Sequence, residues 1–367
     1  MYTQTSGRHK KKKRKKRLTL LLAGIFLVAA VLLVLFFLLR SGTASANLQQ
    51  LPFSSDSLYT SFDNGIVSIQ GKSLTATDEN LEPLFETTLS LSDTKVSVEN
   101  DIICVYTDDE LQALNLKGEV LLSVQPQAIS AVHSSPDSIA VLCDLPDGSQ
   151  VVRLYDLGGN ELATIEANYT ILSFGFNSDG NLWTLALDTS GVVLASRITT
   201  YKDQGNSING IISLESQIIQ DVLFSKQQIY AAGTNHIIGS NYIGETQDSI
   251  LVYGWNLMGS RINAQDEAVF LLTPRMEDVG TPIYNAARII HMNGGDHTTQ
   301  LPPDCTYVLL GEDRFYALAG NILYVYSLDC ELLRKTQIPF EAEVLQPACG
   351  NRAFLTSGQE VYLLELP

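Results

Sequence analysis

The chain has 367 residues, is 45% hydrophobic and carries a formal net charge of −16 at pH 7. The charge is unevenly divided, because all 40 acidic residues lie after Arg40 with only 14 of the 24 Lys and Arg, so this part carries −26. Such a surface repels nucleic acid and anionic polymers, and its apolar content excludes disorder. We therefore expect a folded domain that binds no nucleic acid and whose partners are proteins or cationic ligands.

A basic segment opens the chain and is followed by an uncharged apolar run from Leu18 to Leu39. At about 1.5 Å per residue this run forms a helix of roughly 33 Å, enough to cross a hydrocarbon core of roughly 30 Å. The excess of positive charge before the helix predicts a cytoplasmic amino end. The basic side chains are also expected to contact anionic lipid; they are Arg8, Lys10, Lys11, Lys12, Lys13, Arg14, Lys15, Lys16 and Arg17.

These features predict a single-pass cell-membrane protein with a cytoplasmic tail (1–17), a transmembrane helix (18–39), a tether (40–46) and an extracytoplasmic domain (47–367). One alternative is that the basic segment is a nuclear localisation or nucleic-acid-binding tail. Another is a cleaved signal peptide, because Ala44-Ser45-Ala46 resembles a peptidase site. The apolar core of a signal peptide is about 7 to 15 residues, so the longer run favours an uncleaved anchor.

From Leu58 onward, short apolar runs alternate with turns rich in Asp, Asn and Gly, which predicts an all-β domain. Equivalent turns recur near Thr77, Leu116, Leu157, Thr199, Tyr242, Met292, Leu328 and Leu364. A period near 40 residues, with about four strands in each unit, is typical of β-propeller blades. The pattern predicts eight blades; seven is the alternative, because the unit from Ser249 to Pro302 is irregular and the turn near Thr199 is poorly defined.

The last unit, Glu343 to Pro367, supplies only three strands. The residues Asn47 to Phe53 can supply the fourth, because they precede the strand at Leu58 that opens the first unit. Closing the ring in this way would protect the strand edges. The free tether, Arg40 to Ala46, would then span about 25 Å at full extension, which keeps the domain near the membrane surface.

Two polar stretches interrupt the strand pattern and are predicted to be loops that differ between blades. They are Tyr201 to Gly210, and Pro274 to Pro282 with Arg275, Glu277 and Asp278. Loops on a rigid scaffold often carry binding residues, although a solvated insertion without a partner is the commoner case.

The five cysteines, Cys104, Cys143, Cys305, Cys330 and Cys349, form no C-x-x-C pair. This spacing indicates neither a metal knuckle nor a redox motif. Cys104 and Cys143 occupy matching apolar positions one repeat apart, which predicts core packing. A disulfide between Cys305 and either Cys330 or Cys349 is an open alternative outside the cytoplasm.

Two segments, Tyr155-Asp156-Leu157-x-Gly159 and Tyr326-Ser327-Leu328-Asp329, resemble those of quinoprotein-like and WD40-like propellers. The basic tail, single span and acidic propeller together are similar to a membrane-anchored family of Gram-positive, Clostridia-type bacteria. The resemblance implies a cell-envelope β-propeller of unknown function and carries over no functional residues. Only Trp183 and Trp255 occur, so the repeated Trp motif and the cofactor pocket of quinone dehydrogenases are not expected.

The segment from Phe176 to Trp183 is similar to a turn of lactonase-type and sensor-type propellers. We interpret it as structural, with Asn and Asp capping the turn, Gly180 at positive φ and Trp183 packing between blades. A metal-assisted lactonase site would need several converging carboxylates. The segment occurs once, so we expect blade packing.

The other polar clusters do not have the spacing expected of metal ligands. A cluster of His291, Asp296, His297, Asp304 and Cys305 lacks zinc-site spacing, and Asn293 to Asp296 is predicted to be a hairpin turn. Asp144 to Gly148 is predicted to be a hairpin connection rather than a calcium loop. His133 and His236 are isolated from other ligands, and each is expected to be a partly buried, hydrogen-bonded side chain.

We therefore expect no catalytic residue, no cofactor and no metal site, and predict a non-enzymatic scaffold or assembly factor of the bacterial cell envelope. Its expected partner is an envelope or membrane protein. A sensor domain that binds a small ligand or ion is the first alternative. A metal-dependent hydrolase or lactonase, with Asp179 as the residue to test, is the second.

Overall fold

The structure is a computed structural model that describes residues 44–275 and 282–367. The predicted tail, membrane helix and most of the predicted tether therefore lie outside the described residues. Within them, no helix is long and apolar enough to cross a membrane. The secondary structure of this described part consists of β-strands, which confirms the all-β prediction.

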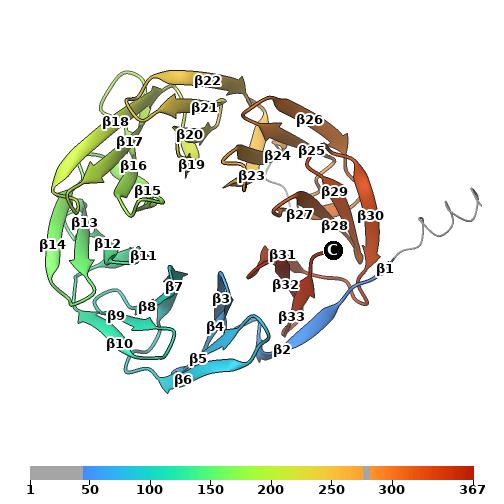
Figure 1. Ribbon diagram of the computed structural model, residues 1–367, viewed down its shortest axis with the longest axis horizontal. Coiled ribbons are helices and arrows are strands. Elements are labelled where there is room, and N and C mark those ends of the chain that lie inside the picture. The colour runs from blue at the N-terminus through green and yellow to red at the C-terminus, as the bar shows by residue number, and fades with distance from the viewer. Residues whose placement is uncertain (1–43, 276–281) are drawn as a thin grey trace, which may run out of the picture. The chain divides into compact units, whose positions relative to one another are not determined.

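Residues Ser45–Pro367 form one compact unit, an eight-bladed β-propeller (Figure 1). Each blade has four antiparallel strands, with the first strand at the centre of the ring and the fourth at the rim, and in blade seven the two residues Ala44–Ser45 add a fifth strand outside the fourth. The prediction of eight blades is confirmed and the alternative of seven is wrong. The turn predicted near Thr199 is misplaced, because Thr199 lies inside a strand that continues to Lys202.

The first four blades follow one another without interruption after the short strands β1 (Ala44–Ser45) and β2 (Leu48–Ser54). Blade one has β3 (Leu58–Phe62), β4 (Gly65–Gln70), β5 (Ser73–Asp78) and β6 (Pro83–Thr88). Blade two has β7 (Lys95–Glu99), β8 (Ile102–Tyr106), β9 (Leu111–Asn115) and β10 (Val120–Val124). Blade three has β11 (Ile129–Ser134), β12 (Ser138–Asp144), β13 (Gln150–Asp156) and β14 (Glu161–Glu166). Blade four has β15 (Thr170–Phe176), β16 (Leu182–Asp188), β17 (Ala195–Lys202) and β18 (Ser207–Glu215).

The remaining blades repeat this order, and the last takes its fourth strand from the start of the domain. Blade five has β19 (Ile219–Phe224), β20 (Gln228–Gly233), β21 (His236–Asn241) and β22 (Thr246–Leu251). Blade six has β23 (Trp255–Ile262), β24 (Ala268–Pro274), β25 (Ala286–His291) and β26 (Gly295–Gln300). Blade seven has β27 (Cys305–Leu310), β28 (Arg314–Ala319), β29 (Ile322–Ser327) and β30 (Leu332–Gln337). Blade eight has β31 (Val344–Pro347), β32 (Arg352–Ser357), β33 (Glu360–Glu365) and β2.

The second strand of a blade is buried on both faces, which explains its continuous apolar sequence. All five residues of β8 are buried, for example, whereas the rim strand β22 is mostly exposed. Eight apolar clusters result, one at each contact between neighbouring blades. The core of the domain is therefore a ring of interfaces between sheets rather than one central mass.

The ring is closed by β2, which pairs with β33 in antiparallel register, Leu48 opposite Leu364. The predicted closing strand is thus confirmed. Leu51 and Phe53 of β2 are 5% and 8% exposed and pack in one cluster with Phe354 of blade eight and Ile66 of blade one. The closing strand therefore contributes side chains to the contact between the last blade and the first.

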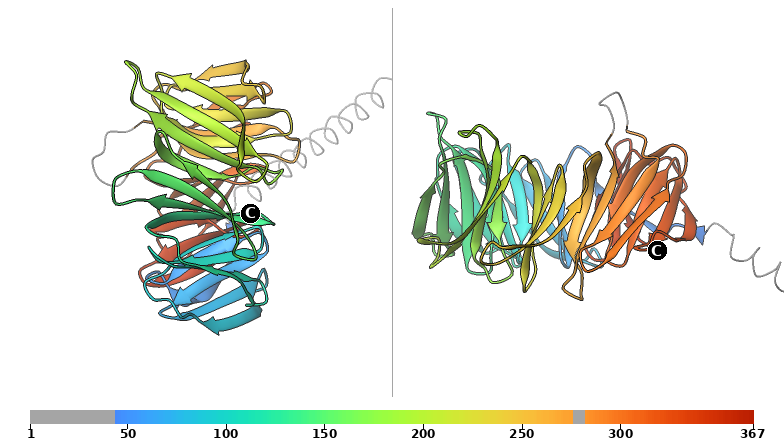
Figure 2. Two further views of the ribbon diagram at one scale, coloured as in Figure 1. Left: turned by 90° about the vertical axis from the view of Figure 1, so that its left-hand side faces the viewer. Right: turned by 90° about the horizontal axis from the view of Figure 1, so that it is seen from above.

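The turns lie at the two ends of the strands, seen edge-on in Figure 2. We letter the four strands of a blade A to D from the centre to the rim. The end with the turns between strands A and B is called the A–B end, and the opposite end, with the connections between strands B and C, the B–C end. At the B–C end, a backbone hydrogen bond in each blade joins the segment that follows the fourth strand to the connection between the second and third strands. These N–H to O=C bonds are Leu89 to Lys72, Ile129 to Asp108, Ala167 to Gln150, Ser216 to Leu194, Val252 to Asn235, Leu301 to Asn285, Ile338 to Asn321 and Ser55 to Gln359.

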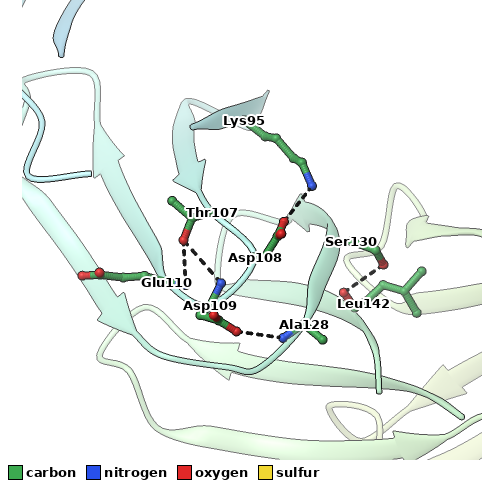
Figure 3. A network of polar contacts seen from close by, with 8 residues as sticks. All are labelled: Lys95, Thr107, Asp108, Asp109, Glu110, Ala128, Ser130 and Leu142. Atoms are coloured by element: carbon green, nitrogen blue, oxygen red, sulfur yellow. Dashed lines mark hydrogen bonds and ion pairs between the residues drawn. The ribbon is translucent and has the colours of Figure 1, made fainter. Parts of the chain in front are cut away.

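Side chains reinforce this bond in blade two (Figure 3). The Thr107 hydroxyl accepts the N–H of Asp109 (3.3 Å) and of Glu110 (3.1 Å), which fixes the B–C turn. Asp109 Oδ1 in turn accepts the N–H of Ala128 (3.3 Å), at the entry to blade three. The loops at the B–C end are thus anchored to one another.

Two sequence interpretations need correction. The stretch Tyr201 to Gly210 is not a loop, because β17 and β18 extend through most of it and only a tight turn separates them. Asp203 and Gln204 adopt positive φ there, beside Gly205, which allows the turn.

The second correction concerns Cys104 and Cys143. Both are buried, as predicted, but they do not occupy matching positions. Their side chains lie in the one cluster between blades two and three, so they point from opposite faces of their own sheets. All five thiols are free, and burial raises the pKa of Cys305 to about 12.

We expect Phe53→Ala to destabilise the propeller by about 3–5 kcal/mol, because the change removes a buried ring from the closing contact. The neighbouring change Gln49→Ala, at an exposed position of β2, should alter stability by less than about 0.5 kcal/mol. Chemical denaturation of both variants checks this. Equal, small effects would show that β2 does not hold the ring closed.

Candidate functional site

A cavity of about 740 Å³ opens at the A–B end, between blades two and five. Its walls come from the A–B turns of blades two, three and four, and from Asp221 on β19. A second cavity, of about 750 Å³, is lined by the A–B turns of blades one, two, seven and eight. The two cavities share Glu99 and Asn100, so both belong to the mouth of the central channel.

Glu99 links blade two to blade three in the wall of the first cavity. Its carboxylate lies 2.7 Å from His133 Nδ1 and accepts the N–H of Ser134 at 3.1 Å. Asn100 donates back from its side chain to the Ser134 carbonyl at 2.7 Å. The His133 ring meets Phe174 of blade four edge-on, with 4.7 Å between centroids. His133 is thus hydrogen-bonded as predicted, but it is not isolated, since Glu99 is its partner.

The segment from Phe176 to Trp183 forms the A–B turn of blade four and borders the same cavity. Asn177 Oδ1 accepts the N–H of Asp179 (3.1 Å) and of Asn181 (2.9 Å), and Gly180 has a φ of 73°. Trp183 packs on Phe224 of blade five, with 5.5 Å between centroids. Blade packing by Trp183 is therefore confirmed. The turn is capped by Asn177 and not by Asp179, whose carboxylate is left exposed.

The charge of both cavities is negative. The carboxylates that line them are Asp63, Glu99, Asp101, Asp137, Asp179, Asp221 and Glu312. Among the residues that the structure describes, no Lys or Arg lines either cavity. The ion pairs found for these acids are Glu99 with His133 and Glu312 with Arg261, the latter at 3.5 Å.

The predicted cluster around His291 separates into pairs. His291 Nδ1 lies 3.5 Å from Glu267, and His297 Nε2 lies 3.5 Å from Asp329. Asp296 is bound by the Arg288 guanidinium at 2.8 and 2.7 Å, which lowers the pKa of that carboxyl.

The two remaining residues of that cluster, Asp304 and Cys305, have structural roles. Asp304 has a φ of 60°, and Cys305 is fully buried with its thiol directed at the Tyr307 carbonyl. Within residues 44–275 and 282–367, no group of three potential ligands is placed to hold a metal ion.

The remaining polar candidates are structural or lie beyond the described part. Asn293 to Asp296 turns the chain from β25 to β26, and Asp144 to Gly148 joins β12 to β13, so both hairpins are confirmed. His236 is partly buried at the start of β21. Glu277 and Asp278 of the second predicted loop lie outside the described residues.

The B–C end has a different character, which the sequence pattern did not reveal. Exposed apolar side chains gather on the loops of blades four and five and on the entry to blade six. We call this set the apolar loop surface: Val192, Val193, Leu194, Ile218, Leu251 and Tyr253. Three hydrogen bonds link the segments that carry these side chains; they join Ser216 N to Leu194 O (3.0 Å), Asn235 Nδ2 to Ser216 O (2.8 Å) and Val252 N to Asn235 O (2.8 Å).

Asp188 anchors the loop that carries Val192. Its carboxylate accepts the Ser190 hydroxyl (2.6 Å) and N–H (3.0 Å), and binds the Arg197 guanidinium at 2.7 and 3.0 Å. The bonds from Ser190, followed by those from Arg197, lower the pKa of Asp188 to about 2. A cavity of about 440 Å³ between blades three and four adjoins the same loop at Thr189 and Ser190.

Residues 43–247, more than half of the chain, match a family model described as "Family of unknown function (DUF5711)". The chain belongs to this family. No functionally curated protein matches it.

Solved structures with the same fold share little sequence with the chain. BamB from Moraxella catarrhalis has a TM-score of 0.56 at 11% identity, covering 89% of this chain and 100% of that one. The WD40 domain of SCAP from fission yeast has a TM-score of 0.58 at 10% identity, covering 88% and 94%. At such low identity the likeness shows a shared propeller fold and nothing finer.

We expect Asp188→Asn to loosen the loop from Thr189 to Leu194, because the amide cannot bind Arg197 as a carboxylate does. Limited proteolysis should cut this loop several-fold faster than in the native protein. In the native protein, the folded state favours the ionised Asp188 carboxylate. The stabilisation of the loop by this carboxylate is therefore complete above about pH 4 and is lost as the pH falls through about 2. Cleavage that begins to rise near pH 6 would contradict this assignment.

Proposed function

We propose that this protein is a non-enzymatic, membrane-tethered scaffold of the bacterial cell envelope, whose propeller holds a partner protein outside the cytoplasm. The observation that carries the proposal is the apolar loop surface. Within it, Tyr253 is 72% exposed and Leu251 is 61% exposed. Exposed apolar side chains gathered on neighbouring, linked segments are a mark of protein–protein contact.

The geometry of the B–C end supports a preformed docking site. Its loops are tied together by backbone bonds, and Asp188 fixes the loop that presents Val192 and Val193. A partner would therefore meet ordered side chains and lose little conformational entropy on binding. The propeller fold, shared with BamB and the WD40 domain of SCAP, is compatible with this role.

The membrane part of the proposal rests on the basic segment and the apolar run from Leu18 to Leu39. The propeller's hydrogen bonds begin close behind that run, because the Ala46 N–H bonds the Gln337 carbonyl at 3.0 Å. The strand β1 (Ala44–Ser45) already pairs with β30, so at most residues 40–43 separate the predicted membrane helix from the propeller, about 14 Å at full extension. The partner would accordingly be a membrane protein or a protein bound near the membrane surface.

The interaction is tested by crosslinking intact cells, solubilising the full-length protein and recovering its partners. The double variant Val192→Asp/Tyr253→Asp should lose more than about nine-tenths of a specific partner, because two charges would be buried in an apolar contact. The matched control is Leu84→Asp/Val120→Asp, which places two charges at exposed apolar positions of blades one and two. Equal recovery of the partner with both double variants would show that the apolar loop surface does not bind it.

Topology has its own test. Protease added to intact cells whose wall has been removed should digest the propeller, while an epitope placed before Arg8 survives until detergent is added. Survival of the propeller in intact cells would place it in the cytoplasm and refute the extracytoplasmic assignment.

A further inference from the structure

We propose that the cavity between blades two and five at the A–B end binds an elongated organic cation that carries several ammonium groups. The site lies at the opposite end of the strands from the apolar loop surface. It therefore goes beyond the scaffold role, and either proposal can fail without the other.

The sign of the charge follows from the cavity wall. Glu99, Asp137, Asp179 and Asp221 line the cavity, and no Lys or Arg of the described residues accompanies them. Asp221 accepts the Ser260 hydroxyl and the Val222 N–H. The carboxylates of Asp137 and Asp179 are exposed and form no ion pair within the described part of the chain. Two carboxylates that face one cavity without a counter-charge, beside the already partnered Glu99 and Asp221, favour a cationic occupant.

The placement of the acids favours an extended cation over a metal ion. The four carboxylates come from four different blades, and in the described residues no three potential ligands converge on one point. A hard cation such as Ca²⁺ requires six to eight oxygens at about 2.3–2.6 Å. Charges set apart around a cavity instead match ammonium groups that are spaced along a chain.

The size and the apolar part of the wall fit the carbon stem of such a cation. The volume of about 740 Å³ lies in the range of organic-ligand pockets. Phe176 and Tyr201 contribute partly exposed aromatic rings to the wall, which can contact methylene groups and attract ammonium groups. The second cavity continues from Glu99 with three more carboxylates, Asp63, Asp101 and Glu312, so a longer cation could extend along the channel mouth.

Isothermal titration calorimetry of the full-length protein in a non-ionic detergent tests the proposal, with spermidine, tetralysine and CaCl2 as probes. We expect spermidine or tetralysine to bind with saturable heat that weakens as salt rises. Tighter binding of spermidine would assign the ammonium groups to a free polyamine, and tighter binding of tetralysine would assign them to the Lys side chains of a peptide. Binding of CaCl2 alone would overturn the proposal.

The double variant Asp137→Asn/Asp179→Asn should weaken this binding about tenfold. Neither carboxylate takes part in a hydrogen bond or ion pair of the described structure, so the fold should be unaffected, which a thermal melt verifies. The matched control is Glu82→Gln/Asp248→Asn, which removes two exposed charges from the region of the rim strands β6 and β22. Equal weakening in both double variants would show attraction to the net charge of the domain and would refute a site in the cavity.

Discussion

The structure depends on pairing the first strand segment of the domain with the last. A row of antiparallel sheets has two free ends, each with an uncovered apolar face and a strand edge. Here β2 pairs with the open strand edge of blade eight, and its side chains Leu51 and Phe53 pack in the apolar cluster shared with blade one, so that both the edge and the face are covered. Each of the other seven clusters then lies between two neighbours in the same way, so no blade is terminal.

Closure leaves the two ends of the strands free to differ in chemistry. At the A–B end, tight turns present Asp and Glu around the channel mouth. At the B–C end, the connection between β16 and β17 and the entries to blades five and six present apolar side chains on segments that hydrogen bonds hold in place. The buried faces of the blades are nearly equivalent, and the differences between blades are concentrated in these connections. A repeating core thus supports two unlike surfaces.

The fold was largely predictable, because its signals are local. Apolar runs recur in every blade and Asx turns in blades one to six, as at Asp156, whose side chain accepts the N–H of Asn160 at 2.8 Å. The closing strand was found by counting strands, since the last unit lacked one. Trp183 was placed correctly because a ring after a tight turn on a buried strand has only the neighbouring blade to pack against.

The surfaces were not predictable, because they depend on contacts between distant residues. Glu99 and His133 are 34 residues apart, and nothing in either neighbourhood marks them as partners. The side on which Cys143 lies depends on a register that a slip of one residue reverses, so the repeat alone could not give its face. Val192 and Tyr253 form one surface only because the loops of successive blades lie side by side.

The closing strand also ties folding to synthesis. Leu48 precedes the first blade in the chain, whereas its partner Leu364 lies in the third strand of the last blade. The ring cannot close until β33 has been synthesised, and before that the blades form an open row with exposed apolar faces at its ends. A truncated chain that lost β33 would leave β2 without a partner strand. Only a chain that contains both β2 and β33 can therefore form the closed ring.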